Sequence, residues 1–596
     1  MPRCECEENG IRPELFVYQR LGKAKQPHPT IGESFMQQET PGNNKLDQPS
    51  PAIRPFWKSV ALSLLAMSCF AVAYAQAPLY FSNQHQYFIH ARAVAGPGYL
   101  HNDWLSTTTD PTPIFTALVA NTYRFSNAVS FEPDGFLYVF YGLLMGVYVL
   151  AMLGLFSVIA KEADSLITRT GFFALFILVH SALVRCLSAR LLGVDYPWYF
   201  QAGVAGQYVL GPMLQPSVFG VLLVLSVFFA AKDKPLLAVM CSSSGAVLHN
   251  TYMLSAAMLT VAYLLVLAYQ RRWWTALATA GLALVIVLPI VIINGLAFMP
   301  TSADTFSEAK HILVHFRIPH HAIPRLWCDH IAWLQIAWMV LGIGLSYGTR
   351  LFPILTIAFV QSAIVSILQI VTDNDTLALL FPWRMSVIVL PIATTIILSR
   401  LVAWLAGVFR TPIGKRIGIW VSVVTIFLAT VSGLVIMMSG LGFQTRDEEL
   451  AMMKYVRDNA VEGDRYLLPV RVPNLEASVS GSQKSDFRPL KKLDTDKQFI
   501  PVNLQRFRMY TGVPIFVDFK SIPYKDEDVL EWRERLKFNE AFYEKLLAGE
   551  EEEVVKMLRE LEITHVVVTT EQPVQHPLLK AVYAGKYYRV FKVPEN

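Results

Sequence analysis

The chain has 596 residues, of which 53% are hydrophobic, and its formal net charge at pH 7 is +5. This apolar fraction exceeds what a soluble globular chain needs, and the small net charge without a contiguous Lys/Arg block excludes nucleic acid as an expected partner. The charge is also uneven, because residues 441–596 hold 24 of the 51 Lys and Arg and 26 of the 46 Asp and Glu. Since charged side chains are costly inside a bilayer, the sequence predicts a polytopic α-helical membrane region followed by a soluble C-terminal domain.

The first 55 residues carry no apolar periodicity and are rich in Pro, Gln, Asn, Glu and Gly. This composition predicts a disordered cytoplasmic tail over 1–55, and Met36 is an alternative start of the chain. The first apolar run, 57–74, lacks a small-residue cleavage signal, so it is expected to remain as a transmembrane helix.

Apolar runs separated by short polar breaks fill 56–440, the predicted transmembrane domain. They lie at 57–74, 135–160, 170–190, 211–231, 235–249, 251–270, 273–298, 331–347, 351–371, 384–405 and 417–439. The pattern predicts about eleven membrane-spanning helices.

Basic residues flank these runs on alternate loops. They are Arg54, Lys58, Lys161, Arg169, Lys232, Lys234, Arg271, Arg272, Arg350, Arg410, Lys415 and Arg416. Because Lys and Arg in short loops mark the cytoplasmic side, the N-terminus is expected in the cytoplasm, and an odd number of spans places the C-terminal domain outside. A bacterial inner membrane is the expected location, and the same topology suits the endoplasmic reticulum.

The large first outer loop, 76–133, contains two predicted helices. Within 79–95, large or apolar side chains recur at roughly helical spacing, which is typical of a helix lying along the membrane interface. After the break at 96–98, Asp110 and Pro111 have the residue types of a helix N-cap and first turn, and they predict the start of the second helix.

A large first outer loop with an interfacial helix, many spans and an outer C-terminal α/β domain together resemble the GT-C superfamily, over about residues 56–596. Its members are integral-membrane glycosyltransferases that take sugars from polyprenyl-phosphate or polyprenyl-diphosphate carriers. The resemblance implies transfer of a sugar from a polyprenyl-phosphate-type donor on the extracytoplasmic face. Membrane lipid and that donor are the implied partners.

The acidic residue or pair that GT-C members carry shortly after the first span is missing from 83–87. Asp103 and Asp110 are the nearest acids, and 110–113 is similar to the proline-rich stretch of protein mannosyltransferase-like members. Inverting transfer needs a carboxylate that deprotonates or orients the acceptor, so Asp103 and Asp110 are the candidate catalytic residues. The alternatives are an Asx turn for Asp103 and a helix cap for Asp110. The Trp-Trp-Asp-Tyr-Gly signature of oligosaccharyltransferases is also missing, which argues against glycosylation of sequons.

The leaving phosphate needs cations or a metal to neutralise it. Arg384 begins an apolar run at its predicted outer end, where a guanidinium can bind phosphate bidentately or extend to lipid headgroups. The 300–330 loop supplies the other candidate phosphate ligands: Arg317, His320, His321 and Arg325.

The same loop places Glu308, His311 and His315 on one face of a predicted helix. These three residues can hold a divalent metal such as Mg or Mn, with His320 or His321 completing the site, or they belong to an ordinary solvated loop. Asp373 and Asp375 fit either a metal site or a turn.

Residues 441–596 alternate predicted helices, at 447–459 and 525–561, with predicted strands at 465–470, 513–518, 564–569 and 587–593. This alternation is typical of a small α/β sheet, here extracytoplasmic. The domain has no Gly-rich phosphate loop or nucleophile elbow. The basic and aromatic stretch 506–524 is expected either to close over a cleft at the membrane surface or to pack between domains.

Two other functions remain open. A non-catalytic GT-C-like scaffold or binding protein is favoured by the missing acidic pair. A transporter of a lipid-linked or anionic solute predicts inverted repeats and charges buried in mid-helix, whereas the polar residues here gather at one predicted face and no clear repeat is found. The oligomeric state, the sugar and the acceptor stay open.

Overall fold

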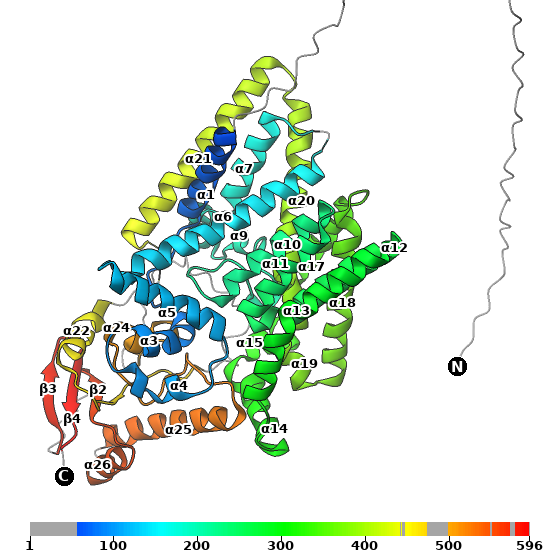
Figure 1. Ribbon diagram of the computed structural model, residues 1–596. Helices are drawn as coiled ribbons and strands as arrows, with labels where there is room; N and C mark the ends of the chain where they lie inside the picture. Colours follow the sequence, from blue (N-terminus) through cyan, green and yellow to red (C-terminus); the bar gives the residue numbers. More distant parts are fainter. Residues whose placement is uncertain are drawn as a thin grey trace, which may run out of the picture. The chain divides into compact units, whose positions relative to one another are not determined.

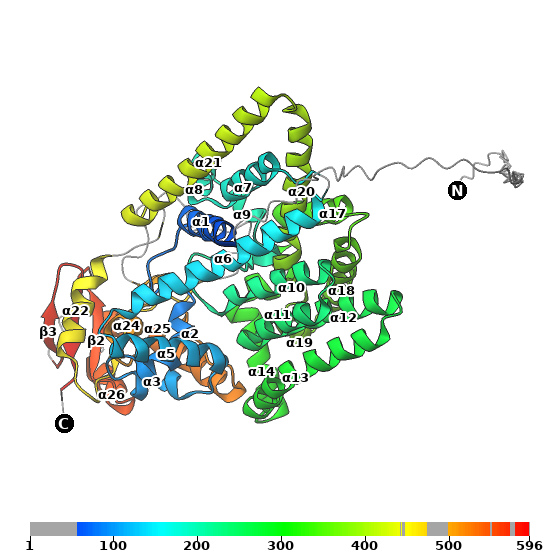
Figure 2. The same cartoon turned by 45° about the horizontal axis from the view of Figure 1, so that its top comes forward.

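In the computed structural model, Phe56–Asn596 forms one compact unit. The structure describes residues 56–594 except 162, 442, 444–446, 474–498, 549–550 and 572–577. The tail predicted over 1–55 lies outside the described residues. Figures 1 and 2 show two views of the molecule.

Each apolar run of the sequence is helical in the structure. The corresponding helices are α1 (Phe56–Tyr74), α6 (Pro133–Ile159), α7 (Leu166–His180), α8 (Ala182–Leu192), α10 (Val221–Ala231), α11 (Pro235–Leu248), α12 (Met253–Tyr269), α13 (Trp273–Ala297), α17 (His330–Leu345), α18 (Leu351–Thr372), α20 (Ser386–Val408) and α21 (Pro412–Ser439). Among the described residues, six helices are long and apolar enough to cross a membrane, or seven if α7 and α8, bent by 50°, form one span. Four further apolar helices are 10–17 residues long, so the number of eleven spans stays a prediction.

The apolar helices differ in how much of their surface the protein itself covers. In an apolar segment of 18 residues, only 17% of α13 and 22% of α21 is buried inside the protein. In the stretch Asp375–Val408, which ends with α20, the buried share of such a segment is 83%. Whole helices that expose apolar side chains require lipid around them. The protein is therefore a helical membrane protein in which α20 is central and α13 and α21 face the surroundings.

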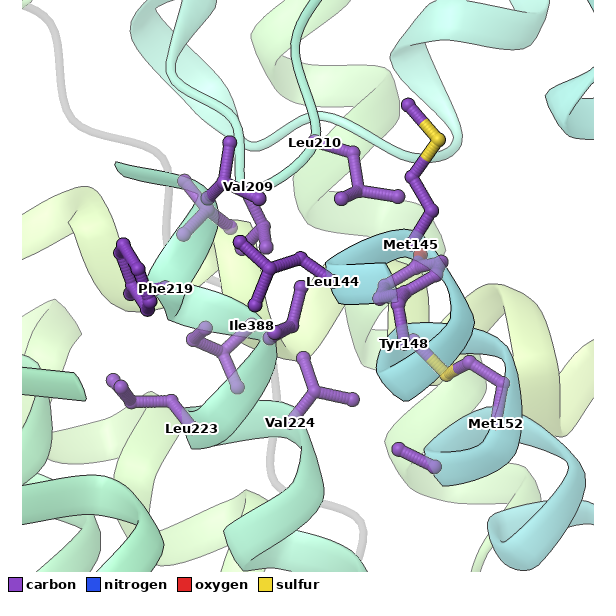
Figure 3. Close-up of a cluster of buried hydrophobic side chains, with 14 of the residues drawn as sticks. Leu144, Met145, Tyr148, Met152, Val209, Leu210, Phe219, Leu223, Val224 and Ile388 are labelled. Carbon is purple, nitrogen blue, oxygen red and sulfur yellow. The ribbon is translucent and has the colours of Figure 1, made fainter. Parts of the chain in front are cut away.

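Side chains of four helices and one loop interdigitate within the bundle. Figure 3 shows this cluster. Its labelled side chains are Leu144, Met145, Tyr148 and Met152 of α6, Val209 and Leu210 of the loop before η3 (Pro216–Gly220), Phe219 of η3, Leu223 and Val224 of α10, and Ile388 of α20. Because lipid tails are as apolar as these side chains, close packing contributes more to helix association here than removal from water.

Three loops that the sequence predicts on the cytoplasmic side meet at Asp233, which lies between α10 and α11. Arg272 donates a hydrogen bond to Asp233 Oδ1, and Arg350 Nη1 lies 3.4 Å from Asp233 Oδ2. Such half-exposed pairs contribute about 0–1 kcal/mol each. They nevertheless show that the starts of α13 and α18 lie beside the loop that joins α10 to α11.

The first outer loop is helical, with shorter helices than predicted. They are α2 (Gln84–Tyr87), α3 (Ile89–Ala95), η1 (Leu100–Asn102), α4 (Trp104–Thr107) and α5 (Pro113–Ala128). The interfacial helix predicted over 79–95 is divided at Phe88, whose side chain is fully buried. The second helix begins two residues later than predicted, because Pro113 occupies its first turn and Thr112 its N-cap.

Further short helices connect the spans. They are α9 (Tyr196–Tyr199), η2 (Val204–Gly206), η4 (Asn250–Tyr252), α14 (Ala303–His311), the π-helical turn η5 (Ile312–Arg317), α15 (Pro319–Ala322), α16 (Pro324–Trp327), α19 (Asp375–Leu379) and η6 (Pro382–Met385).

The C-terminal part contains a four-stranded sheet. Its order is β1 (Tyr466–Leu467), β2 (His565–Thr569), β4 (Tyr588–Lys592) and β3 (Lys580–Ala584), with β1 parallel to β2 and the other pairs antiparallel. The helices of this part are η7 (Asp447–Glu449), α22 (Leu450–Asn459), η8 (Val502–Leu504), α24 (Phe507–Thr511), α25 (Asp526–Ala548) and α26 (Glu551–Glu560).

Three of the four predicted strands are confirmed, although 465–470 is reduced to the two residues of β1. The segment predicted as a strand over 513–518 forms only a parallel bridge from Ile515 to Tyr466. Pro469 and Pro514 each lack the N–H that a longer ladder would use, which explains both short pairings. Strand β3 was not predicted.

We predict that Gly433→Ala destabilises the bundle. Gly433 of α21 lies so close to α1 that an added Cβ would be 2.1 Å from the carbonyl oxygen of Val72. The substitution normally stabilises a helix by roughly 0.5–1 kcal/mol, whereas here overpacking should cost about 1–3 kcal/mol. Thermal unfolding in nanodiscs measures the effect. Gly281→Ala on α13 is the control, because nothing lies within 4 Å of its Cβ position; equal losses in both variants would contradict the close contact.

Candidate functional site

A buried ion triad joins the first outer loop to the C-terminal part. Arg508 Nε donates to Asp103 Oδ2 at 2.7 Å, and Arg508 Nη1 donates to Asp518 Oδ2 at 2.6 Å. The three side chains are at most 3% exposed. Buried carboxylates without a cation are very costly, so Arg508 fixes both acids and thereby the two segments that carry them.

Backbone N–H groups complete the coordination of these two acids. Asp103 Oδ1 accepts from Leu105 N at 2.9 Å as the N-cap of α4, and its Oδ2 also accepts from Ile515 N at 3.0 Å. Burial raises the pKa of Asp518, while the Arg508 guanidinium and the Ser521 N–H act against that rise. Asp103, the predicted catalytic carboxylate, therefore has both oxygens occupied by protein donors.

Two glycines let the same two segments touch through their backbones. Tyr99 N donates to Gly512 O at 2.7 Å, and a Cβ on Gly98 would lie 2.4 Å from that oxygen. Both Gly98 and Gly512 have positive φ, +91° and +75°, which L side chains rarely adopt. The outer loop and the C-terminal part thus form one continuous interface.

Five basic side chains gather beside this interface, and we call them the cation cluster: Arg317, His320, His321, Arg384 and Lys520. The His320 and His321 rings are 4.0 Å apart, and Arg317 Nη2 donates to the Lys520 carbonyl at 2.6 Å. The positive charges of Arg384, Lys520 and Arg317 all act on His321. The cluster unites η5, α15, η6 and the loop before α25.

The two histidines of the cluster are neutral at pH 7. Burial lowers the pKa of His321 to about 4, and the charges of Arg384, Lys520 and Arg317 act in the same direction. The hydrogen bond to the Ala205 carbonyl opposes this shift only in part. Burial also lowers the pKa of His320 well below its usual value, and His321, Arg317 and Lys520 act in the same direction. His321 Nδ1 lies 2.6 Å from the Ala205 oxygen, which can only accept, so this nitrogen carries the proton.

Several N–H groups of the cluster have no protein partner. Within the described residues, the guanidinium N–H groups at Arg384 Nε and Nη1 and at Arg317 Nε are buried without a hydrogen bond, and the ring nitrogen His320 Nδ1, whose proton depends on the tautomer, is buried without one as well. Nor does a carboxylate lie within salt-bridge distance of Arg317 or Arg384 in that part of the chain. A buried unsatisfied donor costs about 1–3 kcal/mol, and more when charged, and this is a cost that an anion bound at the cluster would remove.

Aromatic rings surround the two arginines. The Arg384 guanidinium lies 5.3 Å from the Tyr252 ring centroid and 5.5 Å from that of Phe381, and Arg317 lies 5.0 Å from that of Phe519. Cation–π contacts of this kind hold a guanidinium in place without neutralising it. The positive charge therefore stays available to a ligand.

Amides of α2 replace the acids that the GT-C resemblance leads one to expect after the first span. Gln84 accepts hydrogen bonds from Tyr80 N and Phe81 N and donates to Leu214 O at 3.0 Å, and Gln86 Nε2 donates to the Tyr524 hydroxyl. An amide both donates and accepts, which a carboxylate cannot do. These residues thus stabilise the loop against the rest of the protein.

The structure brings together four of the five predicted phosphate ligands, and leaves Arg325 exposed on α16 outside the cluster. Asp110 lies two residues before the N-cap of α5, where its Oδ1 accepts from Thr112 N at 2.8 Å. Of the predicted metal ligands, His311 and His315 come together with Asp375, whereas Glu308 is exposed and outside that group.

Residues that sequence reasoning did not single out complete the site. Lys520 and Tyr524 lie within the stretch 506–524, whose mixture of basic and aromatic residues was the signal for a surface role. Arg508 also lies there, but its partner Asp103 is 405 residues away. No local pattern links residues so far apart.

Comparison with known proteins gives two similarities. The model of a domain of unknown function, DUF6798, matches residues 494–538, a stretch that contains Arg508, Asp518 and Lys520. Among solved structures, the chain is similar to the arabinofuranosyltransferase AftD from mycobacteria, with 14% identity and a TM-score of 0.37 over 92% of this chain. The alignment covers 42% of that protein. No curated protein matches.

We predict that Arg508→Met and Asp103→Asn each destabilise the attachment of the C-terminal part. Arg508→Met leaves two buried carboxylates without a cation, which should cost about 3–5 kcal/mol. Thermal unfolding and limited proteolysis of the C-terminal part measure the effect. Lys537→Met is the control, because the Lys537–Glu534 pair is exposed and should contribute less than about 1 kcal/mol. Wild-type stability of both triad variants would contradict the structural role.

We also predict that the protein loses stability as the pH falls from 7 to 5. The pKa of His321 is about 4 in the fold and 6.5 ordinarily. Between these values the unfolded chain binds a proton that the folded chain does not, so unfolding is favoured, by about 2 kcal/mol at pH 5. His321→Gln should flatten the decline of the unfolding midpoint with pH. His330→Gln, at an exposed position of the same loop, should leave the slope as in the wild type.

Proposed function

We propose that this protein is a membrane glycosyltransferase that takes a sugar from a polyprenyl-phosphate-type donor on the extracytoplasmic side. The observation that carries the proposal is the cation cluster, whose buried guanidinium N–H groups have no partner in the described residues. A phosphate ester matches these donors in charge and geometry.

The position of the cluster favours a lipid-linked phosphate over a soluble one. Helix α13 starts next to Arg272, which binds Asp233, and its other end leads into the segment that carries Arg317. Its 25 residues span roughly 37 Å, about the thickness of a bilayer. The cluster thus lies at the end of α13 opposite the basic loops, which the positive-inside rule assigns to the cytoplasm.

An apolar groove of about 460 Å³ supports the lipid part of the donor. It is lined by α7, α8 and α9 and by the following Phe200, with Leu178, Leu187, Leu191 and Tyr196 among its side chains. Phe200 precedes Ala205, the hydrogen-bond partner of His321, by five residues, so at most about 18 Å of chain separates groove and cluster. An isoprenoid chain in the groove can therefore place its phosphate at the cluster.

The proposed reaction assigns a role to each group. The bond between the sugar C1 and the phosphate oxygen breaks, and that oxygen keeps the electron pair, stabilised by Arg384 and Arg317. The acceptor hydroxyl forms the new bond to C1 and loses its proton to a base. Because both oxygens of Asp103 are occupied, we assign the base to His320 in the neutral tautomer that leaves its Nδ1, unpartnered among the described residues, free to accept that proton.

One observation also favours a second function, a non-catalytic receptor for lipid-linked phosphates. Asp518, whose charge acts on Arg317, and Asp103, the predicted catalytic carboxylate, are both committed to Arg508. If no other carboxylate takes part, the protein would bind the carrier without transferring its sugar.

Lipid mass spectrometry of the protein purified in native nanodiscs tests the binding step. We predict enriched polyprenyl phosphate in the wild type and its loss in Arg384→Gln, because that change removes the unpartnered guanidinium. Arg325→Gln is the matched control and should retain the lipid, since Arg325 is exposed outside the cluster. Only bulk phospholipid in the wild type, or equal retention in Arg384→Gln, would reject the proposed donor site.

A transfer assay with a labelled lipid-linked sugar separates the two functions. Loss of one group that stabilises the leaving phosphate should lower the rate by about 10²–10³-fold in Arg384→Gln. Bound polyprenyl phosphate without transfer in the wild type would support the receptor instead.

A further inference from the structure

We propose that His311, His315 and Asp375 bind a divalent metal ion of the zinc class. His311 ends α14, His315 lies in η5, and Asp375 begins α19, which packs beside α14 (Figures 1 and 2). One ligand atom from each residue lies within 4.8 Å of the other two. This proposal concerns a site outside the cation cluster and does not depend on the glycosyltransferase function.

The distances suit a metal after small side-chain rotations. His315 Nε2 lies 3.1 Å from Asp375 Oδ1, and His311 Nδ1 lies 3.8 Å from Asp375 Oδ2. Tetrahedral zinc with bonds of about 2.0–2.2 Å holds its ligand atoms about 3.3–3.5 Å apart. The three ligand atoms lie within 4.8 Å of one another, so shifts of about 1 Å bring them to the spacing that such an ion requires, and water can take the fourth position.

A metal-free ion pair explains this arrangement less well. The two imidazole rings stack 4.3 Å apart and both direct a nitrogen to the same carboxylate. A hydrogen bond accounts for only one of these two contacts, because His315 Nε2 lies 3.1 Å from Asp375 Oδ1, whereas His311 Nδ1, 3.8 Å from Asp375 Oδ2, is beyond hydrogen-bond distance. A shared metal would engage all three side chains.

The ligand types select the metal. Two imidazoles and one carboxylate favour zinc or a neighbouring transition metal, whereas Mg and Mn prefer sites made of oxygen ligands. Asp375 replaces the predicted Glu308, whose side chain is exposed and outside the group.

The site would hold the segment that carries part of the cation cluster. His315 precedes Arg317 by two residues on the π-helical turn η5, and Lys310 Nζ donates to Thr376 Oγ1 at 3.0 Å across the same contact. π-Helical turns are frequent at functional sites, because they widen the helix locally. A metal at His311, His315 and Asp375 would thus fix η5 against α19 and position Arg317.

Elemental analysis of the full-length protein, purified through a tag without histidine, tests the site. We expect about one zinc per chain in the wild type and a loss of at least about fivefold in His315→Ala and Asp375→Asn. Glu308→Gln and His330→Ala should retain the metal, because neither residue belongs to the group. If the other variants do not fold, His311→Ala tests the same loss of metal, because the His311 side chain is 68% exposed and its removal should not disturb the fold.

Thermal unfolding with and without a chelator gives an independent readout. The chelator should lower the midpoint of the wild type by roughly 2–4 °C and leave that of His311→Ala unchanged. Metal content that is equal in the wild type and in His311→Ala, or equally chelator-sensitive midpoints, would overturn the site. Metal lost from Glu308→Gln but kept in Asp375→Asn would overturn the ligand assignment.

Discussion

The pairing of Arg508 with Asp103 and Asp518 is the interaction on which the arrangement of the protein depends. It is the point where the first outer loop and the C-terminal part share buried charge. Both acids and the guanidinium are out of water, so none can be withdrawn without leaving a buried charge uncompensated. The triad therefore fixes the two segments relative to each other, and the glycines at 98 and 512 allow their backbones to approach more closely than side chains would permit.

The cation cluster follows from the same contact. Lys520 and Phe519 lie directly after Asp518, so fixing Asp518 also fixes the residues that approach Arg317. On the other side, Arg384 and His321 are placed by the ends of apolar helices and by the Ala205 carbonyl. The triad is thus internally compensated, whereas the cluster next to it carries positive charge without an acid at salt-bridge distance among the described residues. Because of this difference, the proposed phosphate site rests on the cluster and not on the triad.

The sequence predicts the positions of the helices and strands better than the contacts between them. Apolar runs predict the helices, because insertion into a membrane depends on composition alone. The polar residues Arg317, His320, His321 and Arg384 stand out in such a sequence, and the structure brings them together, while their binding of phosphate stays a prediction. The role of Asp103 was not predictable, because Arg508 is 405 residues away and nothing local distinguishes a capping acid from a catalytic one. Likewise, Asp375 joins His311 and His315 only through tertiary structure.

The hydrogen bond between Ile515 and Asp103 joins residues 412 positions apart, so it can form only after the ribosome has made both segments. At a translation rate of about 5–20 residues per second, the outer loop emerges roughly 20–80 s before the chain that must cover it. During that interval Asp103 lacks Arg508 and the N–H of Ile515, and Tyr99 N lacks the Gly512 carbonyl. The membrane helices can insert one after another as they are made, but the outer face of the protein can be completed only after synthesis has passed Asp518.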